Sequence, residues 1–543
     1  MRLFRHCVGS ACLLLVGAAI THAQAPGSPA ALAAKIDQHL AKRWLGAKVT
    51  PAPRADDAEF VRRVHLDLVG RIPTVAETRS FLADKQAERR QRLIERLLSS
   101  PRYGTHFAAV YRALLIPEAG NNFLVRFQQG NFEDWLKQQL ARDVGYDKIT
   151  RELLTFPVGN QGALAVFSLN DGPSPMAFYS AKEFKAESLA AGAARVFLGV
   201  RVECAQCHNH PFAEWKKEQF WGLAAFFSGI QSQRAGDVII PAAEDPNKHE
   251  LTIPGTETVV QAKFLDGKQP DWGKAASVST RTVFADWIAS RDNKYFARAA
   301  VNRTWAYFLG AGLVEPIDDM VGSGAAASHP ELLDLLAREF AAHDFDLKFL
   351  IRAITLTEAY HRTSAGTDKA QGDPALFARM PLRGLTPEQL FDSLVTATGF
   401  RAGDGKESFL EAISGKASAR AQILSKFANL TERPTMAQTS ILHALTLMNG
   451  KIVADATSLE RSETLAALVD APFLSSADRI ETLYLAALSR RPSAKEIDRM
   501  TRFVEEAVRD AGRDEKMLGR ACNDALGDVF WALLNSSEFA LNH

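Results

Sequence analysis

The sequence predicts a mostly α-helical protein: two helical domains joined by a short connector that contains a β-hairpin. Three observations lead to this prediction. Apolar residues recur at helical spacing over most of the 543 residues, and several segments begin with helix-capping motifs. In contrast, residues 233–280 alternate β-branched and polar residues between frequent Pro and Gly. With 47% hydrophobic and 23% charged residues, the composition is that of a globular protein, and the length favours more than one domain.

The chain opens with the features of an export signal at residues 1–23. Arg2 and Arg5 precede an apolar stretch at 11–20 that is too short to span a bilayer. Small residues favour cleavage after Ala23, and a short membrane anchor is the alternative reading. We therefore expect a mature protein that is periplasmic or secreted and has no transmembrane segment.

The first predicted domain, residues 30–232, is helical in its pattern. A tight apolar set ends at Gly70, and "TVAE" at 74–77 is a capping box, in which a side-chain oxygen and a carboxylate satisfy backbone amides at a helix start. Further apolar residues at helical spacing precede Pro101, which ends that helix. Helical segments also lead into and out of the cysteine-containing stretch at 200–215.

The second predicted domain, residues 281–543, follows the connector and returns to helical patterning. Helix starts are predicted at "SHPE" (328–331), "TPEQ" (386–389) and "SAKE" (493–496), because each places an acid or amide three residues after a capping side chain. We find no repeat of fixed period and no low-complexity tract.

Charge and motif content exclude several classes of function. The formal net charge is +1, which gives no electrostatic footprint for nucleic acid or an anionic membrane. The sequence has no nucleophile elbow, P-loop, His-Glu-x-x-His motif or complete dinucleotide fingerprint. Arg62, Arg63 and Asp67 form either a buried ion pair or a polar helix face, and Asp318 and Asp319 are expected in a solvated loop.

The motif that carries chemistry is "CAQCHNHP" at 204–211. Cys-x-x-Cys-His is the attachment signature of c-type haem. Two thiols on one helical turn, Cys204 and Cys207, can bond the vinyl groups of one porphyrin edge, and His208 then lies under the ring to ligate the iron. Beyond the signal peptide, the chain has one other cysteine, Cys522, so no disulfide framework holds the fold.

Other interpretations of this motif stay open. Cys204, Cys207, His208 and His210 are also suitable ligands for zinc or another transition metal, although four ligands within seven residues are cramped. The two cysteines could instead form a redox-active dithiol or a structural disulfide.

The distal iron ligand is not determined by the sequence. For each candidate a core or surface role is the more frequent one; the candidates are His329, His361, His443, Met176, Met436 and Met448. An aromatic set after the motif could wall a haem but is more typical of a plain core; it comprises Phe212, Trp215, Phe220, Trp221, Phe226 and Phe227. We assign His210 to hydrogen bonding or to the turn before Pro211, not to the sixth coordination position.

Several strings together resemble a known tandem family. The first half contains "RRVHLDLVGRIPT" and "FLGVRVECAQCHNHPF", and the second contains "ARAAVNRTWAYFLGAGLVEPIDD" and "WALLNSSEFALNH". They resemble the planctomycete-type secreted cytochrome-c-like domain paired with a planctomycete-specific C-terminal domain (domains of unknown function 1549 and 1553). The resemblance implies an exported haem-type electron carrier with Cys204, Cys207 and His208 as haem-binding residues.

The chain departs from that family pattern in two ways. Many relatives have a separate N-terminal cytochrome c domain, whereas this chain has a single Cys-x-x-Cys-His, and Asn209 stands where relatives often have an acid. A single-site redox protein that serves a redox partner protein or an extracytoplasmic substrate is therefore the first hypothesis. The second is a haem-free binding or scaffold module in which the motif holds a metal ion or a disulfide.

Overall fold

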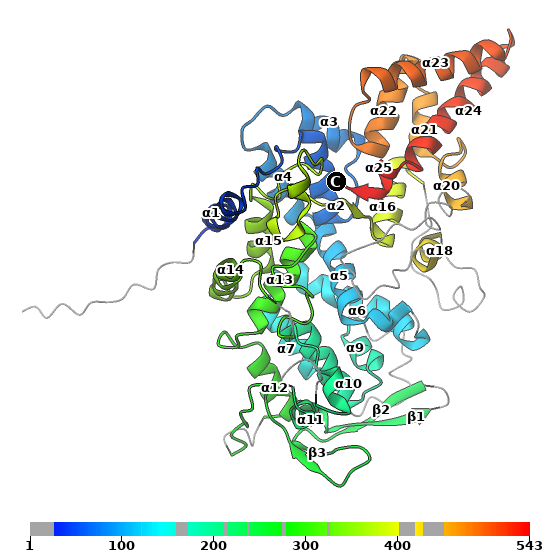
Figure 1. The fold of residues 1–543 in the computed structure, drawn as a ribbon. Helices are drawn as coiled ribbons and strands as arrows, with labels where there is room; N and C mark the ends of the chain where they lie inside the picture. Colours follow the sequence, from blue (N-terminus) through cyan, green and yellow to red (C-terminus); the bar gives the residue numbers. More distant parts are fainter. Residues whose placement is uncertain are drawn as a thin grey trace, which may run out of the picture.

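The computed structural model describes residues 27–120, 122–158, 172–209, 215–235, 238–273, 278–322, 326–400, 419–426 and 450–543. The predicted signal peptide, residues 1–23, lies outside the described residues. Within them the protein is mostly helical, with three small two-stranded antiparallel sheets (Figure 1). The predicted fold class is therefore confirmed.

Up to residue 227, the regular elements of the described residues are helices and short helical turns. Their bounds are α1 (Pro29–Ala47), α2 (Asp57–Val69), α3 (Val75–Ala83), α4 (Arg89–Leu98), α5 (Pro101–Leu115), η1 (Pro117–Gly120), α6 (Phe123–Ala141), α7 (Tyr146–Thr155), α9 (Met176–Ala181), α10 (Ala186–Ala193), η2 (Ala194–Leu198), η3 (Glu203–Gln206), α11 (Lys217–Ala224) and η4 (Ala225–Phe227). The predicted capping box of Thr74 and Glu77 is present at the start of α3. Helix α2 ends at Gly70, where a Cβ would lie 2.4 Å from Nδ1 of His106 and would clash with the ring.

The predicted connector contains two hairpins. Strand β1 (Ile230–Ala235) pairs with β2 (Val238–Glu244), and β3 (Glu250–Thr252) pairs with β4 (Val259–Gln261). Strand formation thus begins at Ile230, three residues before the predicted boundary. The hairpins lie at the end of the molecule opposite to helices α22–α24 (Figure 1).

The described residues that follow are again mainly helical. Its elements are α12 (Thr280–Ile288), α13 (Phe296–Leu309), α14 (Pro330–Ala342), α15 (Leu347–Thr355), η5 (Lys369–Gly372), η6 (Pro374–Leu376), β5 (Arg383–Gly384), α16 (Pro387–Thr398), α18 (Ala419–Lys426), α20 (Lys451–Ala456), α21 (Glu463–Val469), α22 (Ser476–Leu488), α23 (Ala494–Asp510), α24 (Glu515–Leu534), α25 (Ser537–Ala540) and β6 (Leu541–Asn542). The boxes predicted at 386–389 and 493–496 are present. The box predicted at 328–331 does not form, because His329 is the N-cap of α14 and the Ser328 hydroxyl donates to the Leu313 carbonyl instead.

Two hydrophobic cores organise the described residues. The first runs from Leu32 to Met380 and includes side chains from both predicted domains. The second is formed mainly by residues 385–539 and also takes in Leu66 and Ile72 from the N-terminal half. Helix α2 therefore contributes to both cores, and the predicted domain limits remain a prediction.

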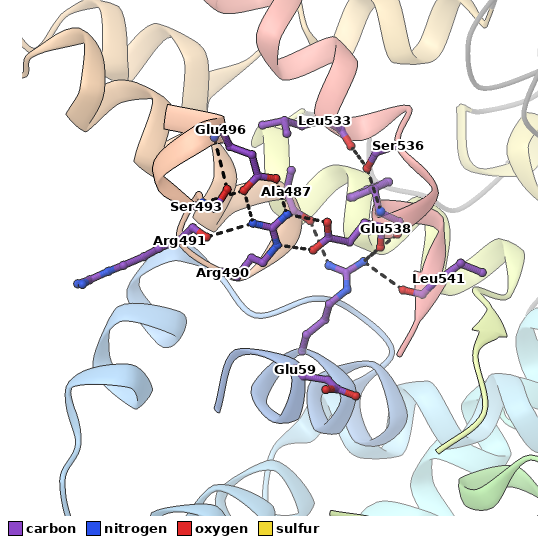
Figure 2. A network of polar contacts seen from close by, with 12 residues as sticks. Glu59, Ala487, Arg490, Arg491, Ser493, Glu496, Leu533, Ser536, Glu538 and Leu541 are labelled. Carbon is purple, nitrogen blue, oxygen red and sulfur yellow. Dashed lines mark hydrogen bonds and ion pairs between the residues drawn. The ribbon is translucent and has the colours of Figure 1, made fainter. Parts of the chain in front are cut away.

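The charged residues that the sequence singled out in α2 are buried, namely Arg62, Arg63 and Asp67. They do not form the ion pair expected among themselves, because their hydrogen bonds go to other residues. The Arg62 guanidinium donates to the carbonyls of Ala487 at 3.1 Å and Phe539 at 2.8 Å. Burial lowers the pKa of Arg62 to about 10. Beside these contacts, Arg490 forms two hydrogen bonds to each of the Glu496 and Glu538 carboxylates (Figure 2).

Asp67 occupies the centre of a second buried cluster. Its carboxylate accepts hydrogen bonds from the Arg383 guanidinium at 2.9 and 3.0 Å, from the Tyr360 hydroxyl at 2.8 Å and from the Asn542 amide at 2.7 Å. Arg63, also fully buried, donates to the Tyr360 carbonyl at 2.6 Å. Every one of these partners is more than 290 residues away in the sequence, so α2 ties distant segments together.

Candidate functional site

The cysteine motif forms a short turn on the surface. Cys204 lies within the 3-10 turn η3 and Cys207 follows its last residue. Ala205 between them is fully buried, and its amide donates to the Val202 carbonyl at 2.9 Å. Both thiols are free and exposed. The turn is therefore anchored through Ala205 and presents its two cysteines to solvent.

Helix α11 supports this turn from behind. The indole N–H of Trp221 donates to the Gln206 carbonyl at 3.0 Å, and the Lys217 amide donates to the Asn209 side-chain oxygen at 3.0 Å. One contact fixes the residue before Cys207 and the other fixes the residue after His208. Both ends of the Cys207-His208 dipeptide are thus held by one helix.

The exposed His208 ring is held through one of its two nitrogens. Its Nδ1 lies 2.7 Å from the carbonyl oxygen of Asn209. With Nδ1–H as the donor, the proton is fixed on that nitrogen, and Nε2 keeps its lone pair for a metal. Two thiols and an imidazole in this state are the donor set that covalent haem attachment requires.

The fourth ligand of the alternative metal site, His210, lies outside the described residues. In the part of the chain that the structure describes, no three His, Cys, Asp or Glu side chains converge as a metal site.

The aromatic residues after the motif belong to the core, which is the role the sequence favoured for them. The described members are all buried, namely Trp215, Phe220, Trp221, Phe226 and Phe227. Phe226, for example, stacks on Phe264 and Phe284 with ring centroids 5.2 and 4.9 Å apart. Phe212 lies outside the described residues.

Charged groups lie on the segments that precede the motif. Lys182 is buried and its ammonium pairs with the Glu118 carboxylate. Burial lowers the pKa of Lys182, and Glu118 opposes that shift. Although the Glu203 side chain reaches solvent, partial loss of water raises its pKa, and the positive charge of Arg195 opposes the change.

The described candidates for a distal ligand are all buried. His361 accepts from Arg54 at Nδ1, at 2.7 Å, which leaves its Nε2–H to donate to the Thr355 carbonyl at 3.1 Å. His329 is buried beside Phe377, and Met176 lies in the first core. His443, Met436 and Met448 lie outside the described residues.

The sequence did not point to the residues that hold the segment before the motif. Arg303 of α13 donates to the carbonyls of Arg195 and Val196, and the Arg201 guanidinium lies 2.8 Å from the Asp318 carboxylate. Asp318 is buried, so the solvated loop expected for it is wrong for this residue. These contacts join segments more than 100 residues apart, and no local pattern announces them.

Two family models of unknown function match most of the chain in tandem. Residues 35–232 match the family model PSCyt2, a protein of unknown function (DUF1549), and residues 280–414 match PSD1, a protein of unknown function (DUF1553). No curated protein and no solved structure matches the chain. Among the described helices, none combines the length and apolar character needed to cross a membrane. The chain therefore belongs to the proteins that carry these two domains in tandem, with the cysteine motif in the first.

Proposed function

We propose that the protein is an exported redox protein that carries one covalently attached c-type haem at Cys204, Cys207 and His208. The observation that carries this proposal is the exposed turn, on which two free thiols flank a buried alanine and an imidazole with an available Nε2 follows directly. When bound, a haem supplies a one-electron iron couple.

The chain's own residues hold and orient the site. Cys204 and Cys207 would anchor one edge of the cofactor, and His208 would approach the metal with Nε2 while Asn209 fixes the ring. Trp221 keeps the turn in place through the Gln206 carbonyl. Because the thiols face solvent, a redox partner protein or an extracytoplasmic substrate can approach this side of the protein.

A second candidate is a haem-free binding or scaffold module. It is favoured by the aromatic residues that follow the motif, because those described are packed in the core and do not form a haem wall. In this case Cys204 and Cys207 form a disulfide, or they hold zinc or another transition metal with His208 and His210.

The intact mass of purified, denatured protein tests the proposal. In a host that matures c-type cytochromes, we expect one haem to remain attached to the wild type and to Cys522→Ala, a control at the half-buried third cysteine. Cys204→Ala and Cys207→Ala should leave haem loosely held or missing. A wild-type mass without haem, from a host that matures other c-type cytochromes, would reject the proposal. Stoichiometric zinc, or a mass lower by two hydrogens, would then identify the alternative.

The two histidines of the motif should differ in effect. His208→Ala should disturb the absorbance spectrum of the bound haem strongly. The histidine directly after Cys207 is the one that the motif places under the ring, and no neighbour can take its place as the proximal ligand. His210→Ala should be milder, since we assign it to hydrogen bonding. The opposite order would contradict the assignment of His208 as the proximal ligand.

Export is tested separately. The predicted signal at residues 1–23 leads us to expect a mature N-terminus just after Ala23 in protein from the cell envelope. Cytosolic protein that retains Met1 would contradict an extracytoplasmic location.

A further inference from the structure

The segment before the cysteine motif has an unusual backbone. Residues 194–198 form a single turn of π-helix, η2, which continues directly from α10. Such turns are rare and occur frequently at functional sites. The turn ends at Gly199, which adopts φ 63 and donates its amide to the Ala194 carbonyl. Val200–Val202 then connect this π-turn to the turn η3, which contains Cys204.

The DUF1553 region packs closely on Gly199. The Met320 amide donates to the Gly199 carbonyl at 2.7 Å. A Cβ on Gly199 would lie 3.0 Å from the Met320 sulfur and 3.3 Å from the Ala299 Cβ, so these residues occupy the space that the glycine leaves. The left-handed φ and the close approach both require glycine here.

Arg303 satisfies the open carbonyls of the π-turn. This half-buried residue of α13 donates to the carbonyls of Arg195 at 3.2 Å and Val196 at 3.3 Å. The last carbonyls of a helix lack partners within it, so an external donor completes the turn. Burial lowers the pKa of Arg303, and the nearby Tyr146 and Asp318 oppose the shift. On the other side of Gly199, Arg201 pairs with Asp318 at 2.8 Å.

We infer that Arg303 is a positioning residue for the cysteine motif. Arg303 holds residues 194–201 in place together with Met320 and Asp318. These contacts fix the orientation of the motif residues Cys204, Cys207 and His208. Residues of the DUF1553 region would thus fix the position of the site that lies in the DUF1549 region. The inference rests on the proposed function in so far as it takes the motif to be the working site.

A purely structural role predicts something different. In that case any arginine with little exposure that donates to backbone carbonyls should behave like Arg303. Arg62 is such a residue, and its carbonyl partners, Ala487 and Phe539, lie outside residues 194–209. Arg62→Gln is therefore the matched control for Arg303→Gln, and Arg303→Lys tests rescue by a conserved positive charge.

The experiment uses reduced, haem-free, full-length protein. The first readout is the ratio of the alkylation rates of Cys204 and Cys207 by iodoacetamide, followed by peptide mass spectrometry. The second is amide hydrogen exchange at Val200 and Met320. For Arg303→Gln we expect the ratio to change about threefold and both amides to exchange about tenfold faster, since the carbonyls of Arg195 and Val196 lose their donor. Arg303→Lys should recover part of both changes, and Arg62→Gln should produce neither.

Two results would overturn the inference: an unchanged ratio in Arg303→Gln, or an equal change in Arg62→Gln. Should Arg303→Gln not fold, Asp318→Asn, which weakens the contact with Arg201, should change the ratio by about twofold. An unchanged ratio in Asp318→Asn would then count against the inference. Because the thiols are measured without haem, a negative haem-mass result leaves this test intact.

Discussion

At the scale of the residue, burial keeps a set of histidines neutral. His65 is fully buried with Nδ1 2.8 Å from the Val61 carbonyl, and burial lowers its pKa to about 4. Burial lowers the pKa of His106 and His329 to about 4 as well, and that of His361 to about 3. In the unfolded chain these rings take up a proton near pH 6.5. Between pH 6.5 and 4 the unfolded state therefore binds more protons than the folded state.

The protein should consequently lose stability in mild acid. The contribution of each neutral ring is complete above pH 6.5 and falls as the pH drops toward 4, by roughly 2 kcal/mol between pH 7 and 5 for His65. His65→Asn should flatten this dependence by about that amount, measured as the difference in urea unfolding free energy between pH 7 and 5. An unchanged difference would show that His65 does not carry this part of the acid sensitivity.

Two helical glycines should respond in opposite ways to alanine. At Gly192 of α10 a Cβ would lie 2.9 Å from the Lys182 Cε, so the added methyl must shift the buried lysine side chain that pairs with Glu118. We expect Gly192→Ala to lower the free energy of unfolding by about 1–3 kcal/mol. Gly130 of α6 has nothing within 4 Å of such a Cβ, and Gly130→Ala should stabilise by about 0.5–1 kcal/mol through helix propensity. Urea denaturation compares the pair, and destabilisation by both would contradict this explanation.

The sequence could identify residues of the candidate site only where they lie close to one another along the chain. Cys204, Cys207 and His208 stand within five consecutive residues, so their spacing alone suggests a chemistry. Arg303 and Met320 reach the motif segment across about a hundred residues. An arginine in an apolar helix gives no indication of which carbonyls it will meet.

At the scale of the element, helix starts depend on single side chains. The Ser475 hydroxyl caps α22, accepting the Asp478 amide at 3.2 Å, while the Ser475 amide donates to the Asp478 carboxylate at 3.1 Å. Ser475→Ala should therefore lower the free energy of unfolding by about 1 kcal/mol. The adjacent Ser476→Ala, inside the first turn, should stay within about 0.5 kcal/mol of wild type. Equal losses in thermal or urea unfolding would argue against capping.

Local elements were largely predictable because local bonds define them. The boxes at 74–77, 386–389 and 493–496 formed as expected, since their partners are three residues apart. The box at 328–331 failed because a tertiary contact from Ser328 to Leu313 competed for the capping hydroxyl. The π-turn at 194–198 could not be predicted, as its carbonyls are completed by Arg303 from another element.

At the scale of the whole molecule, α2 couples the two cores. Arg62 reaches the second core through its bonds to Ala487 and Phe539. Arg62→Met leaves those buried carbonyls without a donor and should destabilise the second core by roughly 3 kcal/mol or more. We expect a separate, earlier transition in calorimetry or urea unfolding.

Arg79 provides the control for this prediction. It also joins the two halves, donating to the Thr482 hydroxyl at 2.9 Å, but it does so at the exposed surface. Arg79→Met should shift the unfolding free energy by less than about 0.5 kcal/mol and keep a single transition. A single transition in Arg62→Met would mean that apolar contacts alone suffice to couple the cores.

The contacts of α2 with residues distant in the sequence also affect the order in which the protein can fold. Arg62 needs partners 425 and 477 positions later in the chain, so its guanidinium has no permanent acceptors while the protein emerges from a ribosome or a translocation channel. Contacts of such high sequence separation form slowly, because a large loop must close first. Helix α2 should therefore gain its final contacts only when the last segments have arrived. For the export that we propose, this delay would keep the polypeptide unfolded while it crosses the membrane.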